Sequence, residues 1–142
     1  MLLLDVNVCV YAIRKDTPDH TGYRIWVNDV LNGDEPVGIS DLALSGVIRI
    51  ITNHRIFRQP STTKQALDSC RALRSGPAAV PLRPGERHWE IFESLCRETS
   101  AKSNAVPDAY HAALAIENGA TWITTDRGFA RFPGLRFRHP LH

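Results

Sequence analysis

The stretch VPDAYHAALAIENGATWITTDRGFARFPGL, residues 106–135, says more about the fold than any other part of the chain. Its first half is rich in alanine, carries Pro107 where a first helical turn would be, and stops at Asn118-Gly119, so it predicts a helix. The apolar run 121–125 then predicts a strand that ends at Asp126. A helix, a glycine, a strand and an acidic residue in this order are typical of a parallel α/β sheet.

The rest of the chain alternates in the same way. Short apolar runs predict further strands at residues 2–4, 36–39, 79–82 and 135–137. Segments with helical spacing of apolar residues predict helices at residues 6–13, 19–32, 42–51, 62–73 and 86–96, with Ser40 as an N-cap before the third. We therefore expect a three-layer α/β/α sandwich with a central, mainly parallel sheet of four to five strands, in a single domain that spans residues 1–142.

The composition fits a small protein of a reducing compartment. At 142 residues and 43% hydrophobic content, the chain can bury a core without disulfides or a structural metal. Its cysteines, Cys9, Cys70 and Cys96, are far apart and form no CxxC pair, which favours buried thiols and argues against a zinc site. No apolar run approaches the roughly 20 residues of a membrane span, and none resembles a signal peptide. We therefore expect a cytoplasmic protein without a membrane partner.

The net charge is nearly balanced, but its distribution is uneven. The formal charge is only +2, which argues against a generic polyanion binder. No acidic residue follows Asp126, whereas Arg127, Arg131, Arg136 and Arg138 do, and another basic stretch contains Arg49, Arg55, Arg58 and Lys64. Arginines beside an acidic pocket suit a phosphodiester substrate, although a solvated surface explains the same pattern. Arg127 and Arg131 are the candidates for substrate contact.

Three aspartates are expected to meet at one edge of the sheet. Asp5 follows the run 2–4 and Asp126 follows the run 121–125, and parallel strands place their carboxyl ends at the same edge. Asp108 falls in the first turn of its helix, where the helix dipole favours an ionised carboxylate. Ionised carboxylates repel one another unless a hard cation neutralises them, and Mg²⁺ commonly binds one or two directly. The pattern predicts a Mg²⁺ site with Asp5 and Asp108 as ligands and Asp126 as the third catalytic residue.

Structural explanations compete with this prediction. Asp108 alone could be a helix cap, and Asp126 alone could be a turn residue. Asp5 has fewer such explanations, because an unpaired buried charge costs roughly several kcal/mol.

Neighbouring polar residues extend the candidate site. Asn7 either orients a ligand or caps the first helix. Thr124 and Thr125 either hydrogen-bond the aspartates or are simply good strand residues. His111 shares a helix face with Asp108, but a packed histidine is the competing explanation.

Three stretches together resemble a known family: LLLDVNV at 2–8, ISDLALSGVIRIITNHRIF at 39–57, and the stretch 106–135. They are similar to PIN-domain ribonucleases, specifically the VapC toxins of type II toxin-antitoxin modules, over essentially the whole chain. The resemblance implies an endoribonuclease dependent on Mg²⁺ or Mn²⁺ that cuts structured RNA, usually tRNA or rRNA. It also implies a homodimer and a small VapB-type antitoxin whose C-terminal segment fills the acidic groove. Asp5, Asp108 and Asp126 fall on the acidic positions of the family.

One position departs from the family pattern. The family usually has a glutamate in the helix after the second strand, where this chain has Gly46 beside Ser45. Asp41 is the nearest acid, but five residues turn a helix by about 140°, so the two positions do not share a face. Asp41 from the helix start, Ser45 or a water is expected to fill the gap. Arg49 is expected to hold a carboxylate or a phosphate, or to form a structural ion pair, and a GxxRxxTN-like run around it indicates a subgroup of the family.

The expected reaction is hydrolysis by a metal-activated water, which leaves a 5′-phosphate and a 3′-hydroxyl. Two other classes remain open. A small-molecule phosphatase of the haloacid-dehalogenase kind also begins with an aspartate after a buried strand, but it normally has a second aspartate where Asn7 stands. A weakened PIN domain would bind RNA or antitoxin without cleavage.

Overall fold

The computed structural model describes residues 1–142, and its centre is a five-stranded sheet in which every neighbouring pair is parallel. The sheet order is β3-β2-β1-β4-β5. β1 is therefore the central strand, and all three of its residues are buried. The strands are β1 (Leu2–Leu4), β2 (Val37–Ser40), β3 (Ala79–Leu82), β4 (Thr121–Ile123) and β5 (Phe137–Arg138). The predicted parallel sheet is confirmed.

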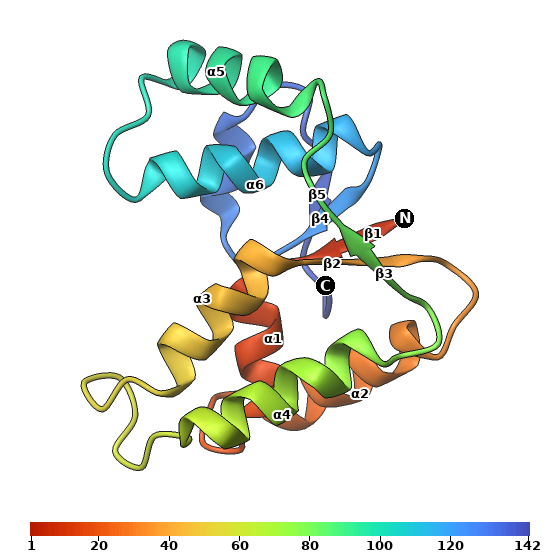
Figure 1. The fold of residues 1–142 in the computed structure, drawn as a ribbon, viewed down its shortest axis with the longest axis vertical. Coiled ribbons are helices and arrows are strands. Elements are labelled where there is room, and N and C mark those ends of the chain that lie inside the picture. Colours follow the sequence, from red (N-terminus) through yellow and green to blue (C-terminus); the bar gives the residue numbers. More distant parts are fainter.

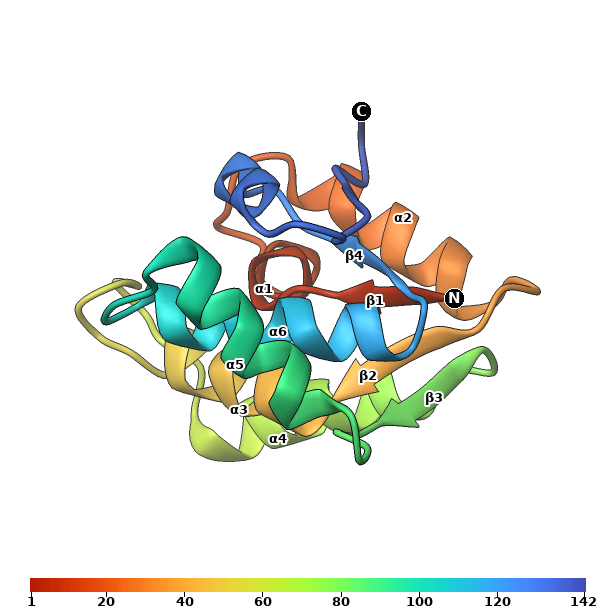
Figure 2. The same cartoon turned by 90° about the horizontal axis from the view of Figure 1, so that it is seen from above.

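Helices cover both faces of this sheet, so the predicted three layers are confirmed (Figures 1 and 2). One core packs Leu2 and Leu4 against α1 to α4, and the other packs Leu3 against α5 and α6. Leu3 and its two neighbours point to opposite faces because side chains alternate along a strand. The helices are α1 (Val6–Ile13), α2 (His20–Leu31), α3 (Asp41–Ile51), α4 (Thr63–Arg74), α5 (His88–Thr99) and α6 (Ala105–Glu117).

Side-chain caps fix where several helices begin. The Ser40 hydroxyl accepts a hydrogen bond from the Ala43 N–H at 3.0 Å, as the sequence predicts. Asp5, and not Asn7, caps α1, so the helix starts immediately after the central strand. Asp5 is thereby held at the carboxyl end of β1, at the edge where an open α/β sheet forms its crevice.

The end of β4 differs from the prediction. The strand stops at Ile123 and not at residue 125, and residues Arg127–Arg131 form a 3₁₀ helix, η1, that the sequence did not predict. The Thr124 hydroxyl accepts from the Asp126 N–H at 3.0 Å, and the Asp126 carboxylate accepts from the Gly128 N–H at 2.7 Å. These local side-chain bonds replace ladder bonds and turn the chain.

Other boundaries move by a few residues. α5 begins at His88 and continues to Thr99, beyond the predicted end at Cys96. The last strand is the pair Phe137–Arg138, not 135–137. The helices are too short or too polar to include a membrane-crossing segment.

Candidate functional site

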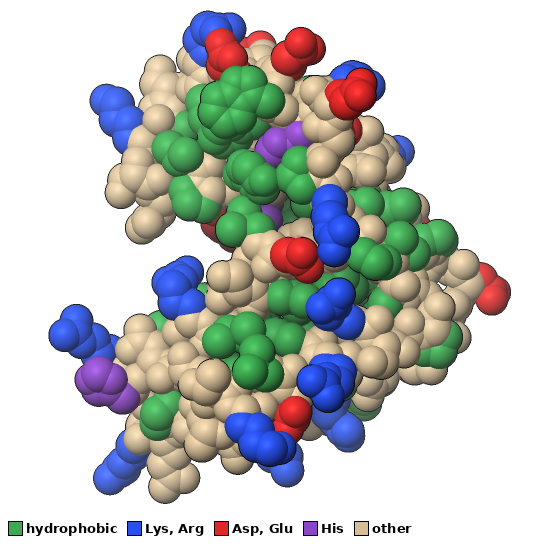
Figure 3. All heavy atoms as spheres, viewed as in Figure 1, with side chains coloured by type: hydrophobic (Ala, Val, Ile, Leu, Met, Phe, Trp, Pro, Cys, Tyr) green, Lys and Arg blue, Asp and Glu red, His purple; other side chains and the backbone are tan.

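The carboxyl edge of the sheet opens into a cleft of about 360 Å³. Residues from the start of α1, the second half of α3, the start of α6 and the turn after β4 line it, so distant parts of the sequence meet there. In the space-filling view, a notch separates the α5–α6 side of the molecule from the α3–α4 side, and basic side chains lie on the α3–α4 side of this notch (Figure 3). The lining residues are Asp5, Val6, Asn7, Arg49, Ile50, Asn104, Pro107, Asp108, His111, Asp126 and Phe129.

Asp5 is the most buried acid of the cleft, with 7% of its surface exposed. Its Oδ1 accepts from the Val6 N–H at 2.6 Å, and its Oδ2 accepts from the Thr124 hydroxyl at 2.6 Å. The pKa of Asp5 is raised to about 6, mainly because the carboxylate is buried, with a smaller contribution from the negative charges of Asp108 and Asp126, and the two hydrogen bonds only partly oppose this. Asp5 is thus a carboxylate whose negative charge is poorly compensated by the protein.

Asp108 and Asp126 face Asp5 from two other elements. Asp108 lies in the first turn of α6 and its side chain is 32% exposed. The Arg131 guanidinium donates to Asp108 Oδ2 at 2.8 Å, so this arginine neutralises the charge of Asp108. Asp126 is exposed and caps η1 through Gly128. The three predicted acids therefore come together in the cleft, and each of them also accepts at least one hydrogen bond from the protein.

Asn7 and His111 add polar atoms that the protein itself does not satisfy. Asn7 Oδ1 and His111 Nδ1 are buried and have no hydrogen-bond partner. The His111 ring stacks on Trp122, with centroids 5.1 Å apart, and burial lowers the pKa of His111 to about 4. His111 is therefore a neutral side chain at physiological pH. An unsatisfied carboxamide oxygen in an acidic cleft is free to accept a hydrogen bond or to coordinate a cation.

These residues fit a hard divalent cation by the chemistry of their donors. Asp5, Asp108 and Asn7 offer carboxylate and carboxamide oxygens, the ligands that Mg²⁺ prefers. No group of three His, Cys, Asp or Glu side chains converges closely enough to hold an ion by itself. Mg²⁺ does not require such a group, because it usually keeps several waters beside one or two carboxylates.

Like Asn7, the predicted supporting residue Arg49 lines the cleft, and it is exposed at the rim. Asp41 and Ser45 do not lie there. They line a separate groove between α3 and α4, and the Asp41 carboxylate is 3.7 Å from the Arg83 guanidinium. They occupy the outer face of α3 because about 140° of helix rotation separates Asp41 from the inward-facing position 46.

Thr125 and Arg127 also lie outside the cleft lining. Thr124, the residue before, bonds Asp5 instead of Thr125. The register pairs Leu4 with Ile123, which places the following residues, Asp5 and Thr124, side by side. A sequence alone does not give this register, so it could not decide between the two threonines.

Gly46 stands at the position where the family resemblance implied a glutamate. A Cβ at position 46 would lie 2.9 Å from Val6 Cγ2, because α3 crosses α1 closely there. Val6 lines the cleft next to Asp5. The space of a side chain at position 46 is thus taken by Val6.

Comparison with known proteins identifies the family. The family model for the PIN domain matches residues 2–135. Ribonuclease VapC43 of Mycobacterium tuberculosis is 50% identical over 141 residues, which cover 99% of this chain and 96% of that protein. The chain belongs to the VapC family of PIN-domain ribonucleases. The family predicted from the sequence is confirmed, and the haloacid-dehalogenase alternative is set aside.

Other VapC proteins and solved structures agree with this assignment. Ribonuclease VapC25 of M. tuberculosis is 36% identical over 140 residues, which cover 99% of both chains. A solved structure of VapBC2 from Rickettsia felis, bound to a DNA fragment from its promoter, shares the fold with a TM-score of 0.69 and 19% identity over 97% of each chain. FitAB bound to a DNA fragment shares it with a TM-score of 0.68 and 21% identity, over 100% of this chain and 96% of that one.

Proposed function

We propose that this VapC-family protein is the toxin of a toxin-antitoxin module and cleaves structured RNA, tRNA or rRNA, in a Mg²⁺-dependent reaction in the cytoplasm, with Mn²⁺ able to substitute. The observation that carries the proposal is Asp5, a buried carboxylate with a pKa of about 6 that faces two further carboxylates in an open cleft. A protein that only needed a helix cap would not bury a poorly compensated charge beside two others.

The residues divide into those that hold the ion and those that meet the substrate. Asp5 and Asp108 would hold the ion, with the unpartnered Asn7 Oδ1 available to it or to its waters. A bound Mg²⁺ would lower the pKa of a coordinated water and neutralise charge on the scissile phosphate. Asp126 would add negative charge at the same edge and fix the turn that carries Arg131. His111, neutral at pH 7, would pack the floor of the site and not transfer protons there.

The arginines at the rim suit a phosphodiester backbone. Arg49 lies on the cleft and makes no ion pair within the chain, so its guanidinium is free for a phosphate. Arg131 is bonded to Asp108 and would exchange this partner for a phosphate once a cation neutralises the carboxylate. Without arginines, the carboxylates would repel the RNA that they are meant to cleave.

The proposed partners follow from the family. The solved neighbours VapBC2 and FitAB are complexes, which supports a VapB-type antitoxin for this chain. The Arg131–Asp108 pair illustrates that a guanidinium can satisfy the acidic cleft, so a basic side chain of an antitoxin could neutralise it in the same way. A homodimer is proposed from the family resemblance alone.

The test is cleavage of total tRNA and rRNA by protein freed of any copurifying partner, with Mg²⁺ and with EDTA. Asp5→Asn and Asp108→Asn are the site variants. Asp68→Asn is the matched control, because Asp68 is exposed on α4 and only pairs with Lys64. We expect discrete fragments that need Mg²⁺, vanish in both site variants and remain in the control.

A second readout separates metal binding from activity. Mg²⁺ should raise the melting temperature of the wild type and of Asp68→Asn, but not of Asp5→Asn or Asp108→Asn, because an ion that binds only the folded state stabilises it. Retained cleavage in Asp5→Asn, or in EDTA, would contradict the proposal. Metal-independent RNA binding without any cleavage would favour a weakened PIN domain that only binds RNA or antitoxin.

A further inference from the structure

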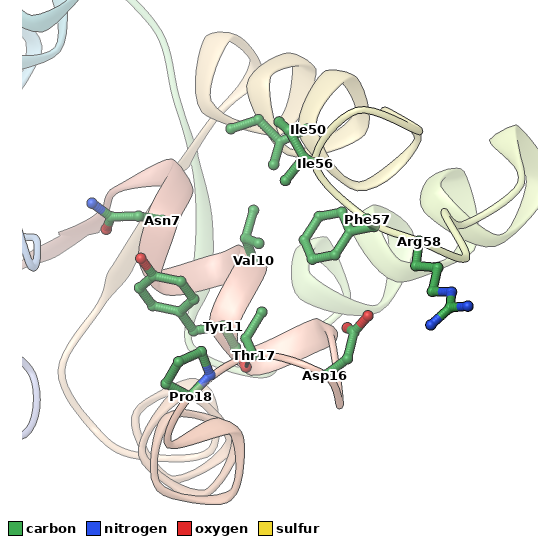
Figure 4. A pocket seen from close by; sticks show the side chains of 10 residues that line it. All are labelled: Asn7, Val10, Tyr11, Asp16, Thr17, Pro18, Ile50, Ile56, Phe57 and Arg58. Carbon is green, nitrogen blue, oxygen red and sulfur yellow. Dashed lines mark hydrogen bonds between the residues drawn. The ribbon is translucent and has the colours of Figure 1, made fainter.

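A second pocket, of about 400 Å³, adjoins the acidic cleft and takes no part in the proposed chemistry. It lies between α1, the end of α3 and the loop that follows α3. Tyr11 and Pro18 face Ile50, Ile56 and Phe57 across it, with Val10 between the two sides (Figure 4). Its lining thus combines two aromatic rings with aliphatic side chains, a composition that suits a flat apolar ligand.

The pocket is a direct neighbour of the acidic cleft. Asn7 and Ile50 line both cavities, so these two residues form the wall between them. Figure 4 places Asn7 at the end of the pocket opposite Arg58. Asn7 therefore stands between a group bound in the pocket and the carboxylate of Asp5, which lines the cleft on the other side.

The pocket is built by bonds within the chain and does not require a ligand to form. The Arg14 guanidinium donates to both oxygens of Asp16 at 2.9 and 2.7 Å and to the Gln59 carbonyl at 2.8 Å. It also lies 4.3 Å from the centre of the Phe57 ring, on one face. These contacts tie the loop after α3 to the end of α1, and they fix Phe57 in place.

The charges around the pocket favour a nucleotide. Asp16, the one acid of its lining, is neutralised by Arg14. Arg58 lines the pocket and Arg49 lines the adjoining cleft, and neither is paired within the chain. Apolar and aromatic walls with free guanidinium groups outside them match a base with its phosphates.

We propose that this pocket binds an unpaired nucleobase of the RNA substrate, adjacent to the scissile phosphate in the acidic cleft. The inference rests on the proposed ribonuclease function and would give the enzyme a preference for the nucleotide beside the cut. An unpaired base is the favoured occupant because the pocket is small, aromatic and framed by arginines. An apolar side chain of a protein partner would fill the same pocket but would not require arginines beside it.

The test measures binding of fluorescein-labelled RNA octamers in EDTA, so that no cleavage occurs. The probes are A₈, U₈ and C₈ and an octamer of the same sugar-phosphate backbone without bases. Ile56→Ala and Tyr11→Leu remove apolar area and the aromatic ring from the pocket. Ile25→Ala is the matched control, because Ile25 on α2 is 51% exposed and Ile56 is 54% exposed. Circular dichroism shows whether Tyr11→Leu is folded. If it is not, the test rests on Ile56→Ala, because the exposed Ile56 side chain can be truncated without loss of the fold.

We expect the wild type to prefer at least one base-containing octamer over the abasic one by about tenfold or more, as stacking of a base on an aromatic side chain predicts. This preference should shrink about tenfold in Ile56→Ala and Tyr11→Leu and persist in Ile25→Ala. An unchanged preference in both pocket variants would overturn the proposal. So would unchanged RNA binding together with weaker antitoxin binding, which would assign the pocket to the protein partner.

The outcome is separable from that of the ribonuclease test. If the wild type cleaves RNA and the pocket variants keep its base preference, the ribonuclease function is supported and the base pocket is refuted. A base preference that depends on Tyr11 and Ile56, in a protein that does not cleave RNA, would keep the pocket and overturn the enzymatic function.

Discussion

Asp5 combines burial with a charge that its neighbours do not compensate. Its two hydrogen bonds come from a hydroxyl and a backbone amide, and its nearest charged groups are also negative. Without a cation, the ionised form destabilises the folded chain at neutral pH. A buried charge that lowers the stability of the fold is expected where the charge is needed for function.

Asp5→Asn should therefore stabilise the metal-free protein at neutral pH. The pKa of Asp5 is raised to about 6 by burial, so the folded chain binds the proton more tightly than the unfolded chain, where the pKa is near 4. The contribution of Asp5 to stability is greatest below pH 4 and is lost as the pH rises through 6, by up to about 3 kcal/mol. An asparagine side chain does not titrate, and its oxygen can still accept one of the two hydrogen bonds. We therefore expect the free energy of unfolding to rise by about 1–2 kcal/mol at pH 7.5.

Urea unfolding of both proteins in EDTA, at pH 4 and pH 7.5, measures this difference. The gain should be largest at pH 7.5 and close to zero at pH 4, where Asp5 is protonated. Asp68→Asn should show no comparable change. An equal effect of Asp5→Asn at both pH values would mean that the charge of Asp5 is well compensated in the folded protein.

Thr124→Val tests the residue that holds Asp5 in place. The substitution preserves the shape of the side chain, but it removes the donor to Asp5 Oδ2 and the acceptor of the Asp126 N–H. A hydrogen bond to a charged group contributes about 1.5–3 kcal/mol, and we expect a loss of this size at pH 7.5 and a smaller one at pH 4. Thr121→Val, at the start of β4, is the control and should change stability by less than about 0.5 kcal/mol. Equal losses in the two variants would indicate a packing effect only.

Residue types and strand ends were enough to predict that Asp5, Asp108 and Asp126 meet. Each follows a strand or opens a helix, and parallel topology gathers such positions. The sequence could not place Asp41, because helix rotation decides which face of α3 reaches the cleft. It could not choose Thr124 over Thr125, because strand register depends on partners far away in the chain.

At the scale of secondary-structure elements, the close contact between α1 and α3 shapes this site. Both helices start directly after neighbouring parallel strands, β1 and β2, and they meet where Gly46 faces Val6. Glycine is unfavourable inside a helix, so its presence in the middle of α3 indicates that the close approach matters.

Gly46→Ala should destabilise the protein although alanine is the better helix former. The intrinsic gain of about 1 kcal/mol is outweighed by a Cβ placed 2.9 Å from a stiff valine side chain, which costs about 1–3 kcal/mol. In a Val6→Ala background the clash disappears, so Gly46→Ala should become stabilising. Chemical denaturation of the four proteins of this cycle gives the coupling between the two positions.

Gly22→Ala provides the matched control within α2. Its Cβ would meet only the end of the Leu141 side chain, at 3.3 Å, and that flexible tip can move aside. We expect Gly22→Ala to stabilise by up to about 1 kcal/mol. A stabilising Gly46→Ala in the wild-type background would show that α1 and α3 separate easily.

Element types were predictable where caps and periodicity agree. Asn118 with Gly119 ends α6, as the sequence predicted. The predicted helix at 62–73 is α4, and the structure shows that a capping box of Thr62 and Gln65 starts it. The helix η1 was not predictable, because it forms through hydrogen bonds that the Thr124 and Asp126 side chains accept from backbone N–H groups and not through an apolar period.

At the scale of the whole molecule, the layers follow from the alternation of strands and helices, but the strand order does not. The chain moves outward from β1 to β3 on one side and returns to add β4 and β5 on the other. The acidic cleft therefore lies at a switch point in the order, between β1 and β4, where open sheets bind ligands.

Three apolar side chains of α2 belong to the core of the molecule. Tyr23 is buried, and Trp26 and Val30 pack against the core next to α1. These side chains stabilise the layer and do not form a free surface.

The distribution of charge over the molecule predicts how salt affects RNA binding. The net charge is +2, but Arg49 on α3 lines the cleft, and the loop that follows α3 carries Arg55 and Arg58, of which Arg58 lines the adjoining pocket. Each phosphate contact of a single strand adds about 0.7 to the slope of log K against log salt. Arg55→Gln, in the loop after α3, should therefore lower this slope by about 0.7 for the octamers in EDTA. Arg97→Gln is the control, because Arg97 pairs with Glu93 on α5, across the sheet, and should leave the slope unchanged. Equal slopes for all three proteins would place the RNA backbone away from this loop, and a reduced slope for Arg97→Gln would place it on the opposite layer.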